Sequence, residues 1–152
     1  MINFIKKMVH GVVLSALYTL ASFGAISTAY ALPAKEVECL SSAAYHEARN
    51  QGDKGILAVM HTILNRTKDS RFPSTPCKVI AQPNQFSYYK HNTPIKEKDT
   101  YNEIKQLAIE VVQGKHKSLN RGALYFHTVN TKPSWSNKLT LVSVIKDHKF
   151  YK

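Results

Sequence analysis

Glu47 is the carboxylate whose surroundings in the sequence favour acid–base chemistry. All ten Asp and Glu residues of the chain follow residue 31, and most fit ordinary roles in first helical turns, at helix caps or beside lysines. Glu47 instead lies near the end of an apolar helical pattern, beside the small residues Ala44 and Ala48. A carboxyl group that is partly shielded by apolar groups has a raised pKa and can donate a proton near neutrality. A salt bridge to Arg49 or Arg66 is the alternative, and the residue types alone favour it.

The spacing of the other polar residues does not support metal or nucleophile chemistry. His46-Glu47 begins like the zinc motif H-E-x-x-H, but residue 50 is Asn where the motif needs a second His. The remaining histidines are not at ligand spacing, and no Ser-His-Asp or Cys-His signature occurs. We therefore expect no metal and no cofactor.

Residues 1–31 match the pattern of a secretory leader. Lys6 and Lys7 give it a positive start, residues 8–34 contain no charged side chain, and residues 29–31 read Ala-Tyr-Ala, an A-x-A cleavage site. We expect residues 1–31 to be a signal peptide or signal-anchor, and residues 32–152 to form one exported domain. Many Gly, Ala, Ser and Thr residues make the apolar stretch only weakly hydrophobic. Three outcomes for the leader therefore stay open: it is cleaved, which we favour, it remains as a membrane anchor, or it anchors the protein transiently before release.

Cys39 and Cys77 are the two cysteines of the chain. In an exported protein an isolated pair favours a disulfide bond. Two buried free thiols are the alternative. A metal site is disfavoured, since neither cysteine has a CxxC or nearby His partner.

The charge is strongly one-sided, with 21 Lys and Arg against 10 Asp and Glu and a formal net charge of +11. Such a surface favours polyanionic partners: nucleic acid, anionic lipid or an acidic wall polymer. Export argues against nucleic acid. The composition is that of a globular domain, and we expect a monomer.

The apolar periodicity predicts helices first and strands afterwards. Helices are expected over residues 35–49, 53–66 and 100–113, the second being the central buried one. Thr100 and Glu103 would form a capping box at the start of the third helix, and Gly114 would end it. Residues 67–99 are expected to be mostly loop, with one short helix from Thr75-Pro76 to Ala81.

The last 30 residues of the chain change character, because β-branched and aromatic residues become frequent. Strands are expected over residues 124–127, 139–145 and 148–151, with Lys146-Asp147 as the turn between the last two. This order predicts an α+β fold with a small antiparallel sheet.

Linked motifs along residues 39–151 resemble the SleB/CwlJ-type cell-wall hydrolases, which include the catalytic domains of spore-cortex lytic enzymes. The resemblance rests on several segments in consistent order: Tyr45-His46-Glu47-Ala48-Arg49, GILAVMHTILNR at 55–66, Arg71-Phe72-Pro73 with Cys77, Gln85-Phe86-Ser87, GALYFH at 122–127 with Pro133 and Trp135, and Ile145, His148, Phe150 and Tyr151. Two positions depart from the pattern. Gln51 replaces a usual Glu, and Lys146-Asp147 replaces a turn that is commonly Gly-rich.

The resemblance implies a lysozyme-like α+β fold, related to lytic transglycosylases, and cleavage of the β-1,4 bond between N-acetylmuramic acid and N-acetylglucosamine. Residues 32–152 would be the catalytic domain, in the periplasm or at the cell wall, and peptidoglycan glycan strands would be the partner. Glu47 would be the catalytic acid. The candidates for the cleft wall are Gln85, Phe86, Ser87, Tyr125, His127 and Trp135.

One well-placed carboxylate favours a lytic transglycosylase. A hydrolase needs a second carboxylate to act as nucleophile or to activate water. A lytic transglycosylase does not, because the same glutamate can then take the proton of the muramoyl 6-OH. A hydrolytic muramidase, such as a lysozyme-like endolysin, and a peptidoglycan-binding domain without activity are the alternatives.

Overall fold

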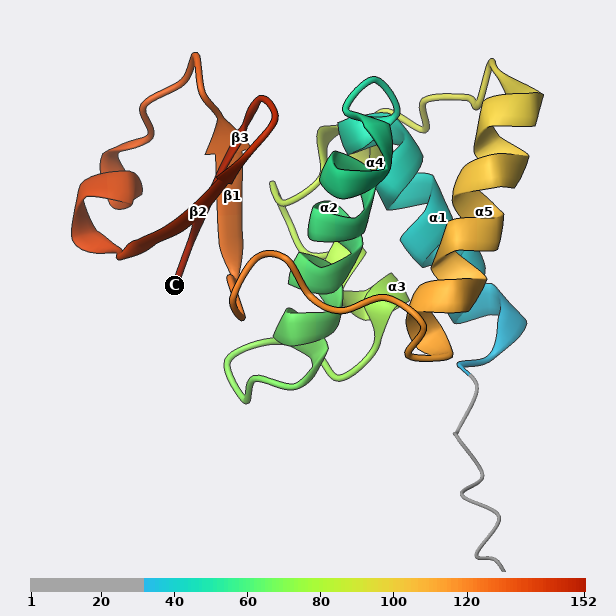
Figure 1. The fold of residues 1–152 in the computed structure, drawn as a ribbon, viewed down its shortest axis with the longest axis horizontal. Coiled ribbons are helices and arrows are strands. Elements are labelled where there is room, and N and C mark those ends of the chain that lie inside the picture. The colour runs from blue at the N-terminus through green and yellow to red at the C-terminus, as the bar shows by residue number, and fades with distance from the viewer. Residues whose placement is uncertain (1–31) are drawn as a thin grey trace, which may run out of the picture.

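The computed structural model describes residues 32–152, so the expectations for the leader lie outside the described part. The chain forms α1 (Ala34–Ala48), α2 (Gly52–Thr67), α3 (Pro76–Ile80), α4 (Ser87–Lys90) and α5 (Lys98–Val112). It then forms β1 (Tyr125–Thr128), the 3₁₀ helix η1 (Ser134–Lys138), β2 (Leu141–Ile145) and β3 (His148–Tyr151). The predicted order of helices first and a small sheet afterwards is confirmed, with the two parts side by side (Figure 1).

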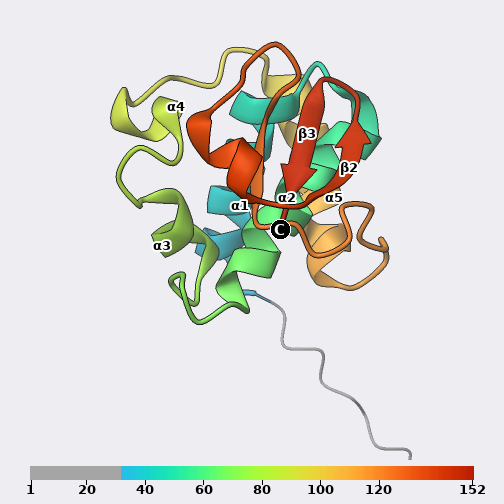
Figure 2. The same cartoon turned by 90° about the vertical axis from the view of Figure 1, so that its left-hand side faces the viewer.

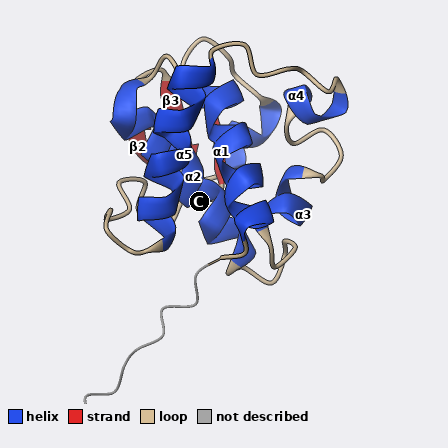
Figure 3. Ribbon diagram, turned by 90° about the vertical axis from the view of Figure 1, so that its right-hand side faces the viewer, coloured by secondary structure: helices blue, strands red, loops and turns tan. Residues whose placement is uncertain are grey.

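Helix α2 is the centre of the fold, as its apolar pattern predicts. It lies between the sheet on one side and α1 and α5 on the other (Figures 1 and 3). Val59, Met60 and Ile63 of α2 pack with Leu40 of α1 and Ile104 of α5, and each is at most 1% exposed. Burying such side chains contributes roughly 1.5–3 kcal/mol apiece. This packing fixes the end of α1, where Glu47 lies.

The three strands form one antiparallel sheet in the order β1-β3-β2, which lies across α2 (Figure 2). Phe150 of β3 contacts Ala58 of α2 and Ala123 in a second apolar cluster, and this cluster joins the sheet to the helices. The register of β2 on β3 is irregular between Leu141 and Ser143. Lys146 has φ 52° in the tight turn between β2 and β3, at the place that the sequence predicts.

A disulfide bond joins Cys39 of α1 to Cys77 of α3, as predicted, with Cα atoms 5.2 Å apart. The alternative of free thiols is therefore wrong. Beside the bond, the backbone N–H of Cys77 donates to the Glu36 carboxylate at 2.8 Å. These links hold α3 against the first two turns of α1.

Some local predictions differ from the structure. The capping box at Thr100 and Glu103 is wrong, because α5 begins at Lys98 and Glu97 precedes it without a side-chain cap. Tyr101 and Ile104 pack into the core on the first turns of α5, and this packing favours the earlier start. The short helices α4 and η1 were not predicted. Gly114, with φ 75°, follows the end of α5 as expected.

Within residues 32–152, every helix is too short or too polar to cross a membrane.

Candidate active site

Glu47 is the second-last residue of α1 and is partly buried. Burial raises the pKa of its carboxyl group above the usual 4.5. The C-terminal end of a helix carries partial negative charge, which also disfavours a carboxylate there. The surroundings of Glu47 therefore favour the protonated form that a general acid needs.

The predicted alternative, a salt bridge from Glu47 to Arg49 or Arg66, is wrong. Arg49 pairs with the carboxylate of Glu97, with 3.2 Å between Nε and Oε2. The Tyr45 hydroxyl donates to the same carboxylate and accepts hydrogen bonds from the backbone at residues 96 and 97. Arg66 donates elsewhere. Within residues 32–152, Glu47 forms no ion pair.

Glu47 lines a cleft of about 700 Å³ between the helices and the sheet. Four predicted wall residues, drawn from distant parts of the chain, line the same cleft: Gln85, Tyr125, His127 and Trp135. The rings of Tyr125 and Trp135 lie 5.8 Å apart and give the wall a broad aromatic surface. Aromatic faces of this kind stack on the apolar faces of sugar rings.

His127 is held in the wall by hydrogen bonds at both ring nitrogens. Its Nδ1 lies 2.7 Å from the backbone oxygen of Thr128, and its Nε2 lies 2.9 Å from the hydroxyl of Tyr151. Because a carbonyl oxygen only accepts, Nδ1 carries a proton and donates it to Thr128. His127 therefore has a fixed orientation.

A second hollow, of about 340 Å³, lies on the other side of Glu47. Ser87, another predicted wall residue, lines it together with Tyr88 and His46, whose rings stack at 4.3 Å. Glu47 borders both hollows, which are called the two arms of the cleft below.

Phe86 is the predicted wall residue that does not line the cleft. Its side chain is only 3% exposed and packs in the core. The guanidinium carbon of Arg66 lies 6.0 Å from the centre of its ring. Phe86 therefore supports the wall from below, between the exposed residues Gln85 and Ser87.

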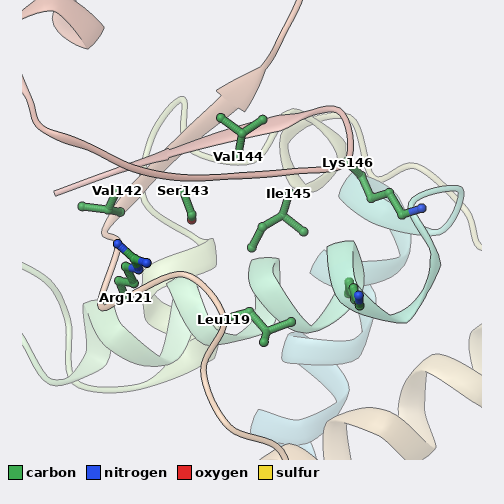
Figure 4. A pocket seen from close by; sticks show the side chains of 8 residues that line it. Leu119, Arg121, Val142, Ser143, Val144, Ile145 and Lys146 are labelled. Carbon is green, nitrogen blue, oxygen red and sulfur yellow. The ribbon is translucent and has the colours of Figure 1, made fainter.

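A separate groove of about 490 Å³ runs along β2 (Figure 4). Leu119 and Ile145 point into it, and Arg121 and Lys146 lie at its rim (Figure 4). It is lined by no carboxylate and by none of the predicted site residues, so it offers no general acid. No group of His, Cys, Asp or Glu in residues 32–152 is arranged to hold a metal ion.

Residues 50–151 match the sequence profile of a family described as Cell Wall Hydrolase. The chain belongs to this family. Two solved catalytic domains are similar to this cell wall hydrolase in fold. The germination-specific lytic transglycosylase SleB from Bacillus anthracis is 24% identical, with a TM-score of 0.68 over 79% of this chain and 96% of that one. The Bacillus cereus SleB protein is 25% identical, with a TM-score of 0.67 over 77% and 89%.

The predicted family and the lysozyme-like α+β fold are thereby confirmed, and this cell wall hydrolase is an enzyme. No curated protein matches the chain. Glu47 lies just before the matched residues, so its role depends on the geometry of the cleft.

Arg66 is a cleft residue of this cell wall hydrolase that the sequence prediction missed. A signal was present, because Arg66 follows Val59 and Ile63 on the apolar stripe of α2, where a charged residue is unusual. His148 lines the larger arm and Tyr88 lines the smaller one. The sequence prediction missed both, because aromatic residues are equally common in a core.

Proposed function

We propose that this enzyme cleaves the β-1,4 bond between N-acetylmuramic acid and N-acetylglucosamine in peptidoglycan as a lytic transglycosylase. The observation that carries the proposal is Glu47 itself. Among residues 32–152 it is the only carboxylate that lines either arm of the cleft. Its raised pKa suits a proton donor. The similarity to the Bacillus anthracis lytic transglycosylase supports the reaction type.

The proposed reaction uses Glu47 twice. Its carboxyl group first protonates the glycosidic oxygen while the bond from that oxygen to C1 of the muramoyl sugar breaks. The carboxylate then takes the proton of the 6-OH of the same sugar, whose oxygen bonds to C1 and closes a 1,6-anhydro ring. Glu47 returns to its starting form, and no water is consumed.

The aromatic arm suits the glycan, since Tyr125 and Trp135 offer faces on which sugar rings stack. The enzyme would meet this substrate in the periplasm or at the cell wall, after export through the leader. A hydrolytic muramidase would need a second carboxylate beside Glu47. A binding domain without activity would not need a shielded carboxyl group with a raised pKa in its cleft.

Mass spectrometry of the muropeptides released from purified peptidoglycan tests the proposal. A lytic transglycosylase yields 1,6-anhydro products, which are lighter by one water than hydrolytic products. Glu47→Gln keeps the shape of the side chain and removes the proton donor, so activity should fall by about 10²–10⁴-fold while the protein still folds and binds peptidoglycan. Asp53→Asn, an exposed carboxylate on α2, is the matched control and should remain active. Reducing-end products without the anhydro ring would identify a muramidase, and near-normal lysis by Glu47→Gln would refute the role of Glu47.

A further inference from the structure

Arg66 is a buried cation without a carboxylate partner in residues 32–152, and it lies at the wall of the cleft. It is 4% exposed. Its guanidinium carbon lies 5.2 Å from the ring centre of Phe72 and 5.7 Å from that of Tyr125. Burial lowers the pKa of Arg66 to about 10, so the group stays protonated near neutrality. Burying a charged guanidinium is unfavourable unless hydrogen-bond acceptors surround it.

Two neutral oxygens supply these acceptors. The Nε of Arg66 donates to the backbone oxygen of Leu124 at 2.6 Å, and its Nη1 donates to Oε1 of Gln85 at 3.0 Å. A guanidinium has donors only, so the amide of Gln85 must present its oxygen to Arg66. The amide nitrogen of Gln85 must then point the other way.

The backbone around Gln85 keeps this side chain at the cleft. Its N–H donates to the oxygen of Gln82, Asn84 precedes it in the left-handed region with φ 61°, and the buried ring of Phe86 follows it. Gln85 is exposed and lines the cleft with Glu47. Within residues 32–152, its Nε2 donates no hydrogen bond. The wall therefore carries a pair of N–H donors whose direction is set by Arg66.

We propose that Arg66 is a positioning residue that fixes the amide of Gln85, so that its Nε2 donates to the acetamido oxygen of a substrate sugar. This inference rests on the proposed function. Sugar hydroxyls donate and accept, so they fit either orientation of an amide. The acetamido oxygen only accepts, and a fixed donor distinguishes it from the ammonium group of a deacetylated sugar. Phe126 and Leu139 line the same cleft and offer an apolar surface to the acetamido methyl group.

Gln85→Glu is the decisive variant. It preserves the contact with Arg66 and replaces the hydrogen-bond donor that faces the cleft with an acceptor. The new carboxylate pairs with the guanidinium, so the melting temperature should be equal or higher. The group facing the substrate becomes an acceptor. Both enzymes are compared on N-acetylated peptidoglycan and on chemically N-deacetylated peptidoglycan.

On the acetylated glycan, Gln85→Glu should lose about tenfold or more in kcat/KM, mainly through KM, because a fixed donor is replaced by a repelling acceptor. On the deacetylated glycan the variant should equal or exceed the parent, since the sugar ammonium now meets a carboxylate. A variant that keeps the parent's preference for acetylated glycan would overturn the inference.

Arg66→Lys tests the positioning role in the same assays. Lys lacks the planar fork, so it should raise KM on acetylated glycan while Gln85 is present. In a Gln85→Ala background it should add no further rise, and an additive rise would show that Arg66 does not act through Gln85. Inactivity of the parent enzyme on both glycans would instead refute the proposed function and this inference with it.

Discussion

The side-chain amide of Gln51 holds Asp147 by two hydrogen bonds. Its Nε2 donates to the Asp147 carboxylate at 3.2 Å, and its Oε1 accepts from the Asp147 backbone N–H at 3.1 Å. These residues are the two places where the sequence departs from the family pattern, and the structure brings them together. The contact ties the corner between α1 and α2 to the turn between β2 and β3. Gln51 lines neither arm of the cleft, so it is not a second catalytic group.

Gln51→Glu, which restores the usual family residue, should lower the free energy of unfolding by roughly 0.5–1.5 kcal/mol, because a second carboxylate would then face Asp147. Asp147→Asn alone should be tolerated. The double variant should recover most of the loss, since an amide again faces a carboxylate. Urea unfolding of the four proteins gives the coupling energy. Strictly additive effects would show that the two side chains are independent.

Activity should fall as the pH rises through the raised pKa of Glu47. The general acid acts only when it is protonated, and burial raises its pKa above 4.5, so the falling limb of the pH–rate profile should lie above that value. Initial rates of muropeptide release, measured across a pH series, check this. Asp53→Asn should leave the limb unmoved. A limb centred at or below 4.5 would show that Glu47 titrates as an ordinary exposed carboxyl group.

Glu47→Gln should stabilise the fold at neutral pH. The pKa of Glu47 is raised in the folded state, so the folded protein holds this proton more tightly than the unfolded chain, and stability is lost as the pH rises above 4.5. A neutral amide removes that loss. Thermal unfolding should show a higher melting temperature for the variant at pH 7, with the difference vanishing below pH 4.5. An equal difference at both pH values would attribute the gain to packing.

The Cys39–Cys77 bond should contribute up to about 4 kcal/mol, because it closes a loop with a sequence separation of 38 residues in the unfolded chain. Replacing both cysteines with Ser should therefore lower the melting temperature markedly. Neither cysteine lines the cleft, so activity measured well below the new melting temperature should persist. Mass mapping without reductant should find the linked peptides in exported protein. Two alkylatable thiols there would contradict the bond.

Replacing Ser22 and Gly24 with Leu should deepen membrane anchoring and delay lysis. The leader is diluted by small residues, and two added leucines strengthen its hold on the bilayer. Glu47 follows the leader closely, so a retained leader would hold α1 against the membrane. Fractionation and lysis timing in producing cells check this. A variant that is fully soluble and lyses as fast as the parent would show that the leader acts only as an export signal.

The three long helices α1, α2 and α5 could be predicted from the sequence because their apolar residues recur at the helical period. The start of α5 could not, since the pattern Thr100-x-x-Glu103 also fits inside a helix, and only the packing of Tyr101 against the core favours the earlier turn. Gln85, Phe86 and Ser87 are contiguous, but one of them is buried and two are exposed, which the motif alone does not reveal.

The small, apolar neighbours of Glu47 predicted a partly shielded carboxyl group, which the structure confirms. The absence of an arginine partner could not be predicted. Arg49 binds Glu97, which follows it by 48 positions in the sequence, and Arg66 binds Gln85, which follows it after the segment that contains α3. Tertiary packing determines which of these charged and polar side chains come into contact. The local sequence shows which residues are charged and how they are spaced. It does not show which acidic residue pairs with which basic residue.

The irregular register of β2 bears on self-association. β2 is an edge strand, and its Leu141 and Val144 are 48% and 55% exposed. A straight, apolar edge of this kind would add a strand from another copy and begin to aggregate. The break in pairing between Leu141 and Ser143 and the charged Lys146 at the strand's end interrupt that edge. The edge at which the sheet could otherwise extend is therefore poorly suited to pair with the same strand of a second copy.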